Sequence, residues 1–163
     1  MSIKKWFAPI SFAVLLDAEN KKTDLSSSSS INVGFVGAGS FAKSLLLPNF
    51  PKNINKVAVA TASSHNARDV SEKYNFKHAF GDGKDVINHK DVNTVFITTR
   101  HNTHTKFVLD SLKKRKHIFV EKPLCMNEDE LNQIMNLYSS SEQYLMVGYN
   151  RRFSPHIKKI IEI

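Results

Sequence analysis

The residue types and spacing at 37–42 are suited to binding a phosphorylated nucleotide. The segment reads Gly-Ala-Gly-Ser-Phe-Ala, and it lies between a β-branched and aromatic run at 31–36 and an apolar pattern with helical spacing. A G-x-G-x-x-A spacing between a strand and a helix is typical of loops that bind the pyrophosphate of a dinucleotide. Glycine-rich turns of this kind also occur in methyltransferases and flavin proteins, so the spacing alone leaves the nucleotide open.

Each small residue of this loop has a predicted task. Gly37 permits the tight turn, Gly39 lets the backbone approach the phosphates, and Ala42 allows the helix to pack closely on the strand. The first free N–H groups of the helix, around Ser40 and Phe41, then face the phosphate charge. We therefore predict that these five residues bind the cofactor.

The elements that must position this loop alternate regularly along the chain. Short β-branched and apolar runs predict strands, and amphipathic patterns predict helices. The predicted strands are 31–36, 56–61, 94–98, 117–120 and 144–148, with a short one at 77–80, and the predicted helices are 40–48, 65–74, 83–89, 104–114 and 127–140. Strands separated by helices favour an α/β fold with a doubly wound, Rossmann-like parallel sheet. The ligand crevice of such a sheet lies at the carboxyl ends of its strands.

Length and composition favour one folded domain with additional residues at each end. The chain has 163 residues, of which 41% are hydrophobic, and we assign residues 31–150 to the dinucleotide-binding domain. Residues 1–30 are interpreted as an N-terminal extension with a serine-rich linker. Pro9 interrupts the apolar stretch near the start, and no stretch is long enough to span a membrane, so no membrane partner is expected.

Charge and cysteine content exclude several classes of partner. The formal net charge is +8, and a compact basic run stands at 113–116. That run lies at a predicted helix end, where cations complement the dipole, and no nucleic-acid-binding motif accompanies it, so no nucleic acid is expected. Cys125 is the single cysteine, which excludes an internal disulfide and favours a reducing, cytoplasmic location. His101 and His104 lack a third ligand, so no metal is predicted.

The chain resembles the Gfo/Idh/MocA oxidoreductases over nearly everything from 31 to 163. Four segments carry the resemblance, namely the glycine loop, Thr-x-x-x-x-His at 99–104, Glu-Lys-Pro at 121–123 and Val-Gly-Tyr-Asn-Arg-Arg-Phe at 147–153. The resemblance implies an oxidoreductase that uses NADP or NAD to transfer a hydride to or from a sugar, cyclitol or related polyol. It also implies that Lys122 lies beside the nicotinamide and moves the hydroxyl proton.

The resemblance and the predicted sheet edge together extend the set of candidate binding residues. Beyond the glycine loop, the candidates for cofactor binding are Thr61, Ser63, Ser64, Thr98, Thr99, Arg100, His101, His104, Glu121, Lys122 and Pro123. Thr61 stands where relatives often carry an acid for the ribose diol, which leaves both cofactors open with a lean toward NADP. Arg115 replaces a glycine of the relatives, so we predict that it adopts a left-handed backbone conformation.

Relatives of this family continue into a second α/β domain that binds the substrate and builds the oligomer interface. We therefore expect residues 151–163 to begin that domain, and residues 1–163 to bind cofactor without turning over a small-molecule substrate. A homo-oligomer is expected only with the missing domain. Two alternatives stay open: a non-catalytic nucleotide-binding module, which has no need of Lys122, and an S-adenosylmethionine-dependent methyltransferase, which usually has an acid at the position of Thr61.

Overall fold

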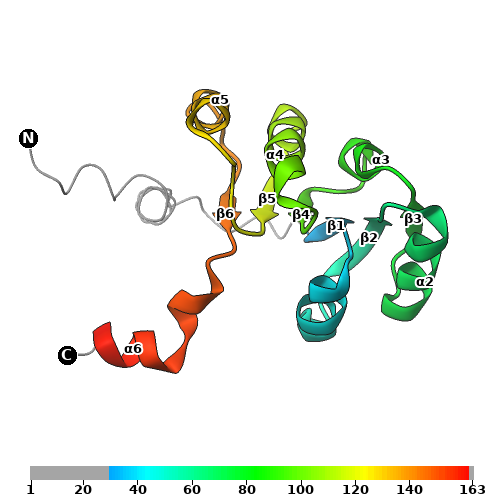
Figure 1. Ribbon diagram of the computed structural model, residues 1–163. Coiled ribbons are helices and arrows are strands. Elements are labelled where there is room, and N and C mark those ends of the chain that lie inside the picture. The colour runs from blue at the N-terminus through cyan, green and yellow to red at the C-terminus, as the bar shows by residue number, and fades with distance from the viewer. Residues whose placement is uncertain (1–29, 162–163) are drawn as a thin grey trace, which may run out of the picture.

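A six-stranded parallel sheet forms the centre of residues 30–161, the part of the chain that the computed structural model describes. Its strands are β1 (Asn32–Val36), β2 (Asn55–Ala60), β3 (His78–Phe80), β4 (Thr94–Ile97), β5 (His117–Val120) and β6 (Leu145–Val147). They lie in the order β3-β2-β1-β4-β5-β6, and every neighbouring pair is parallel (Figure 1). The order in which the chain adds strands reverses between β1 and β4, so the predicted doubly wound α/β fold is confirmed. Residues 1–29 of the predicted N-terminal extension lie outside the described residues.

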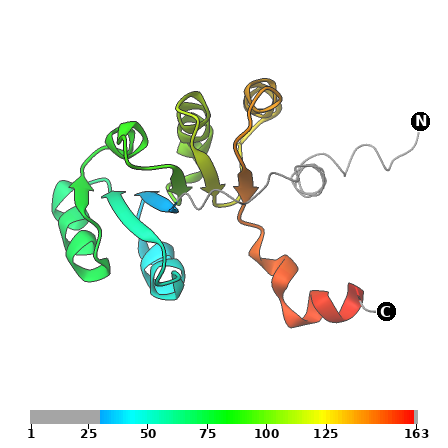
Figure 2. The same cartoon turned by 180° about the vertical axis from the view of Figure 1, so that it is seen from behind.

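Helices lie on both sides of this sheet. On one side are α3 (Gly83–Asn88), α4 (His104–Lys113) and α5 (Glu128–Tyr138), and on the other side α2 (Ser64–Tyr74) lies beside β2 and β3 (Figures 1 and 2). Within residues 30–161, none of the helices has the length and apolar character needed to cross a membrane.

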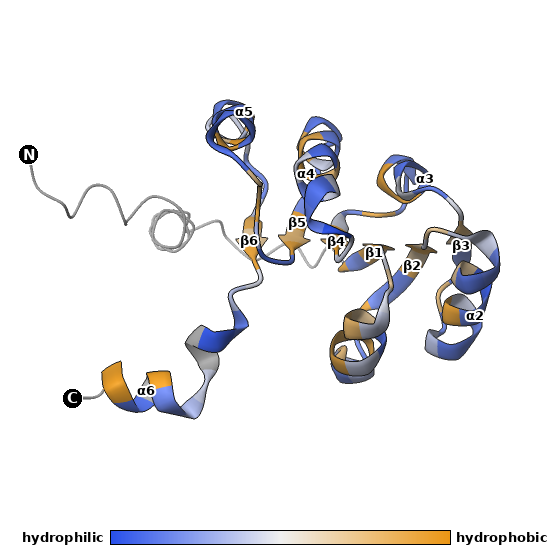
Figure 3. Cartoon of the chain, viewed as in Figure 1, coloured by the Kyte–Doolittle hydropathy of each residue, from blue (hydrophilic) through white to orange (hydrophobic). Residues whose placement is uncertain are grey.

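The core lies on both sides of β1 and β2. Phe35 of β1 packs on the side of α2, in a cluster that includes Val70. Val36 packs on the opposite side, in a cluster that includes Val108 of α4 and Ile134 of α5. Strands covered on both faces carry apolar residues at successive positions, and Figure 3 shows hydrophobic residues concentrated on the strands.

A row of large apolar side chains crosses the other half of the sheet, on the face opposite α4 and α5. The strand register places Phe96 of β4 beside Phe119 of β5, and Phe119 beside Met146 of β6. The rings of Phe96 and Phe119 stack with their centroids 4.9 Å apart, and Met146 is 40% exposed. The last described helix, α6 (Pro155–Ile161), lies away from this face (Figure 1). The row is therefore a partly exposed apolar surface.

The helix after the glycine loop is less regular than the predicted helix at 40–48. Residues 40–41 are α-helical, η2 (Ala42–Leu46) is a π-helix, and η3 (Leu47–Asn49) is a 3₁₀-helix. Pro48 has no N–H, so the ladder of backbone hydrogen bonds is interrupted there. The Lys43 carbonyl instead accepts a hydrogen bond from the Tyr74 hydroxyl of α2 (2.8 Å). A tertiary contact thus satisfies a backbone group in this irregular helix.

The other predicted helices have bounds within two residues of the observed ones, and side-chain caps explain where α2, α3 and α5 start. The Asn127 side chain accepts a hydrogen bond from the Glu130 N–H at the start of α5 (2.9 Å), as the Asn-x-x-Glu spacing predicts. The Glu130 carboxylate accepts from the Met126 N–H (2.7 Å) and from the Thr105 hydroxyl of α4 (2.9 Å). Three short helices are found that the sequence patterns do not predict, namely η4 (His101–Thr103), η5 (Asn150–Phe153) and α6.

Arg115 adopts the predicted left-handed conformation, with φ at 54°. It follows α4 in a turn closed by two backbone hydrogen bonds. The Arg115 N–H donates to the Leu112 carbonyl (2.9 Å), and the Lys116 N–H donates to the Ser111 carbonyl (3.0 Å). This pair of bonds is the Schellman arrangement, which usually takes glycine at the left-handed position.

Replacing Arg115 with glycine is expected to stabilise the domain. Relief of about 1–2 kcal/mol of backbone strain exceeds the roughly 0.5–1 kcal/mol of extra chain entropy that glycine loses on folding. Urea unfolding should therefore show a modest rise in the free energy of unfolding. Asn75→Gly is the matched control at φ 60°, and its gain should be smaller because asparagine tolerates this region. A loss of stability in Arg115→Gly would contradict the argument.

Candidate functional site

A cavity of about 790 Å³ opens at the carboxyl edge of the sheet. Its walls come from the glycine loop after β1 and from the loops that follow β2, β3 and β4. This is the edge at which the strand order reverses between β1 and β4. Ligands of doubly wound sheets bind at such a reversal point, so the cavity occupies the predicted crevice.

The cavity brings together many of the candidate binding residues. Those that line it are Gly37, Gly39, Ser40, Phe41, Ala42, Thr61, Thr98, Thr99 and Arg100. Those that lie outside its lining are Ser63, Ser64, His101, His104, Glu121, Lys122 and Pro123. The lining also includes polar side chains that sequence reasoning missed, namely Lys43, Asn66, Asp82 and Thr103. Asp82 follows the short strand β3 at the same edge, and that position is the signal that would have found it.

Gly37 is required by the fold itself. Its φ is +90°, and a Cβ at this position would lie 2.8 Å from the Thr99 backbone nitrogen. Its N–H donates to the Ala60 carbonyl (2.9 Å), and its carbonyl accepts from the Thr98 hydroxyl (2.7 Å). The turn therefore packs closely between the ends of β2 and β4. The G-x-G spacing predicts a tight turn of this kind.

Gly39, unlike Gly37, is not required by the fold. The nearest atom that a Cβ at this position would meet, outside the adjacent residues, is the Gly37 carbonyl oxygen at 4.0 Å. Gly39 lines the cavity, so the space beside its backbone is open to a ligand. The absence of a side chain there suits a phosphate that must approach the backbone closely. An open space beside the backbone at the start of a helix is suited to binding the pyrophosphate of a dinucleotide.

The charged side chains of the cavity lining favour an anionic ligand. Lys43 and Arg100 contribute two positive charges, and Asp82 contributes one carboxylate. The Asp82 carboxylate already accepts a hydrogen bond from the Lys84 N–H (2.9 Å), as the cap of α3. The positive field therefore lies near the glycine loop and the loop after β4.

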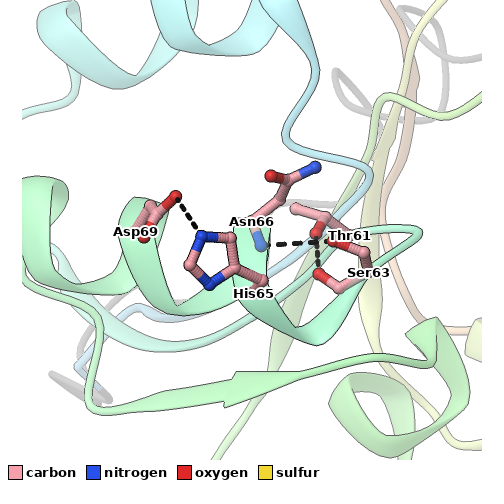
Figure 4. A network of polar contacts seen from close by, with 5 residues as sticks. All are labelled: Thr61, Ser63, His65, Asn66 and Asp69. Carbon is pink, nitrogen blue, oxygen red and sulfur yellow. Dashed lines mark hydrogen bonds and ion pairs between the residues drawn. The ribbon is translucent and has the colours of Figure 1, made fainter.

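The end of β2 carries hydroxyl groups and no carboxylate (Figure 4). The Thr61 hydroxyl donates to the Ser63 carbonyl (2.6 Å), and the Ser63 hydroxyl accepts from the Asn66 N–H (3.3 Å) as the cap of α2. Further along the helix, His65 Nε2 lies 3.9 Å from Asp69 Oδ2. Thr61 thus has a local partner, and the N-terminal end of α2 stays beside the cavity through Asn66.

The loops of this edge start from backbone hydrogen bonds that continue the sheet. The Thr98 N–H donates to the Val36 carbonyl (2.9 Å), and the Glu121 N–H donates to the Ile97 carbonyl (2.9 Å). Gly37 makes the corresponding bond to β2. Each loop stem is therefore fixed by the neighbouring strand.

Lys122 is exposed just after β5, two strands from β1. Its backbone N–H lies 3.3 Å from a carboxylate oxygen of Glu121, and the Lys122–Pro123 peptide bond is cis. Its side chain does not line the cavity of the glycine loop. The structure thus separates the candidate proton-transfer group from the candidate phosphate site by the width of β4.

His104 is fully buried at the start of α4, with none of its surface exposed. Its Nδ1 lies 2.6 Å from the Pro123 carbonyl oxygen, and its Nε2 lies 3.1 Å from the Thr99 carbonyl oxygen. His101 stays exposed, and the centroids of the two rings are 5.8 Å apart. Within the described part of the chain, no group of three metal-ligating side chains comes together.

Two groups with shifted pKa values lie away from the cavity. Burial lowers the pKa of Lys116, and the charge of Lys114 lowers it further. Burial raises the pKa of the Cys125 thiol, and the charge of Glu130 adds to this. A thiol with a raised pKa is a poor nucleophile, and Cys125 packs partly buried against the apolar core.

Comparison with known proteins gives the family. A family profile described as "Oxidoreductase family, NAD-binding Rossmann fold" matches residues 31–149. The chain belongs to the Gfo/Idh/MocA oxidoreductase family. The glycine loop and the Glu-Lys-Pro segment both lie within the matched residues, and the resemblance predicted from the sequence is confirmed.

Curated Gfo/Idh/MocA relatives include a cyclitol dehydrogenase. The chain is similar to the myo-inositol 2-dehydrogenase of Thermotoga maritima, with 30% identity over 105 residues that cover 64% of this chain and 31% of that protein. It is also similar to the uncharacterized oxidoreductase YrbE of Bacillus subtilis, with 27% identity over 132 residues that cover 80% of this chain and 38% of that protein. The chain therefore spans well under half of the length of these relatives.

Solved structures show the same fold with nicotinamide cofactors. A levoglucosan dehydrogenase in complex with NADH and levoglucosan has a TM-score of 0.72 at 25% identity, covering 82% of this chain and 40% of that chain. KijD10, a 3-ketoreductase from Actinomadura kijaniata in complex with NADP, has a TM-score of 0.75 at 19% identity, covering 82% and 42%. The Gfo/Idh/MocA chain described here thus carries an NAD-binding Rossmann domain, and the methyltransferase alternative is not favoured.

Proposed function

We propose that the cavity binds NADP or NAD for an oxidoreductase that transfers a hydride between the nicotinamide and a sugar, cyclitol or related polyol. The observation that carries the proposal is the open space at Gly39, in a cavity also lined by Lys43 and Arg100. A pyrophosphate there would meet backbone N–H groups at a helix start and two cations. The relatives named for myo-inositol and levoglucosan support the substrate class.

Different loops of the chain are assigned different roles. Residues 39–41 hold the pyrophosphate, and the loops after β2 and β4 hold the rest of the nucleotide. The bound nicotinamide supplies the hydride chemistry. Lys122 takes the proton from the substrate hydroxyl in oxidation, or returns it in reduction, from its position after β5. Its exposure leaves the amine free to reach a substrate that arrives from outside this domain.

We assign residues 31–150 to the cofactor-binding domain and 151–163 to the start of a substrate-binding domain. The greater length of the relatives supports this division. In that arrangement the second domain supplies the remaining contacts to the small-molecule substrate. Any homo-oligomer interface belongs to it as well.

Between the two cofactors we favour NADP. The strand end that often carries a carboxylate for the ribose diol carries Thr61 here, so the repulsion of a 2′-phosphate by a carboxylate at this position is absent from the described site. Ser63, Ser64 and Arg68 follow it in the sequence, are exposed, and offer hydroxyl groups and a positive charge. Asp82 lies in the loop after β3, where it caps α3.

Calorimetric titration of the purified chain with NADP, NAD and S-adenosylmethionine tests the proposed function. NADP is expected to bind most tightly, NAD more weakly, and S-adenosylmethionine not at all. Pyrophosphate alone serves as the control for the shared phosphate contacts and should compete with NADP. Preferential binding of S-adenosylmethionine, or no binding of either nicotinamide cofactor, would refute the proposal.

A further inference from the structure

The ring of His104 contacts the backbones of two separate loops. One ring nitrogen faces the carbonyl of Thr99 in the loop after β4, and the other faces the carbonyl of Pro123 in the loop after β5. Carbonyl oxygens accept hydrogen bonds and never donate, so each nitrogen that carries a proton donates to its carbonyl. The burial of the ring excludes water as a competing partner. One side chain thus joins the backbone beside Arg100 to the backbone beside Lys122.

The loop after β4 is also fixed to the glycine loop. The Thr98 hydroxyl donates to the Gly37 carbonyl (2.7 Å). Within the same loop, the Thr103 hydroxyl donates to the Arg100 carbonyl (2.7 Å). A series of hydrogen bonds and short backbone segments therefore runs from the glycine loop through Thr98 and His104 to the residue after Lys122.

We propose that His104 is a positioning residue that fixes the loop of Lys122 relative to the cofactor cavity. It acts through the two backbone carbonyls and touches neither the cavity nor the reacting atoms. An imidazole suits this task because its two nitrogens point in different directions from a rigid ring, and an apolar ring of similar size has no donor for either carbonyl. The catalytic consequence rests on the proposed function, whereas the link between the loops does not.

Amide hydrogen exchange in the cofactor-free chain tests the link. The reporting groups are the Thr103 N–H, which donates to Arg100 (3.0 Å), and the Glu121 N–H, which donates to Ile97 (2.9 Å). His104→Phe keeps an aromatic ring but removes both ring nitrogens. We expect exchange at both amides to rise about tenfold or more, while exchange at Val59 in β2 stays within about twofold, because opening is local to the loops.

Two further variants separate positioning from simple packing. His104→Gln keeps one donor group, so it should recover part of the protection lost in His104→Phe. His89→Phe is the matched control, because His89 is a half-buried histidine in the turn after α3, away from both loops. It should leave both reporting amides unchanged.

Two results would overturn the proposal. An equal rise at Val59 and Thr103 in His104→Phe would mean that His104 only supports the core, and an unchanged rate at Glu121 would mean that the loops are not linked. A parallel titration of the unmodified chain with NADP reports on the proposed function alone. If that titration fails while the exchange result holds, the link between the loops stands without the catalytic role.

Discussion

Replacing Gly39 with valine is expected to abolish binding of NADP and NAD while leaving the domain folded. The protein leaves room at this position, since the nearest atom to an added Cβ, outside the adjacent residues, is the Gly37 carbonyl oxygen at 4.0 Å. The branched side chain would instead fill the space where a pyrophosphate approaches the backbone. Calorimetry should show at least about a 100-fold loss of affinity, which corresponds to about 2.7 kcal/mol. Circular dichroism should show an unchanged melting transition.

Gly37→Val is the informative partner of this variant, because the two glycines have different tasks. Its Cβ would lie 2.8 Å from the Thr99 nitrogen, at a φ of +90°. We expect Gly37→Val to lower the melting temperature, whereas Gly39→Val lowers affinity alone. Equal cofactor affinity in Gly39→Val and the unmodified chain would show that the pyrophosphate binds elsewhere.

Residues 1–163 are expected to bind cofactor without reducing or oxidising it against any aldose, inositol or nucleotide sugar. Hydride transfer requires a substrate held with its carbon near the nicotinamide, and positioning of this kind supplies several kcal/mol of the barrier. Lys122 is the proposed proton-transfer group, but the proposed substrate contacts belong to a second domain. The absorbance of the reduced nicotinamide, followed with each substrate in turn, measures whether any turnover occurs. Robust turnover by residues 1–163 would mean that the active site lies elsewhere in the chain.

In a protein that joins this chain to a substrate-binding domain, Lys122→Ala should lower kcat by about 10²–10⁴-fold, the range of general acid–base catalysis. The affinity for NADP should change little, because Lys122 lies outside the lining of the phosphate cavity. Lys90→Ala is the control, since Lys90 is an exposed lysine in the turn after α3. A kcat that falls equally in both variants would argue against a proton-transfer role.

The sheet could be predicted closely from the sequence because buried parallel strands leave short, continuous apolar runs. The run at 117–120 is the observed strand His117–Val120, and the run at 94–98 differs from Thr94–Ile97 by one residue. Parallel pairing then decides which loops share an edge. That is why the sequence alone predicts Gly37, Thr61 and Thr98 at one crevice, where all three line the cavity.

The rest depends on contacts between segments far apart in the chain. The π-helix after the glycine loop has its Lys43 carbonyl satisfied by Tyr74, which lies in α2. Asp82 reaches the cavity because the short strand β3 pairs with β2. The Thr-x-x-x-x-His spacing marked His104 as a site residue, but the unpredicted turn η4 precedes it, and its ring is buried rather than in the cavity lining.

The backbone hydrogen bonds at the loop stems have a consequence for how this domain could diversify. The bonds made by the N–H groups of Gly37, Thr98 and Glu121 are between backbone groups, so they do not depend on the side chains further along each loop. Exposed positions such as Arg100 and His101 can therefore change while the loop stems stay in place. Directed evolution of cofactor choice can explore these positions with little cost in stability, which makes the carboxyl edge a surface of high evolvability on a frame held by backbone hydrogen bonds.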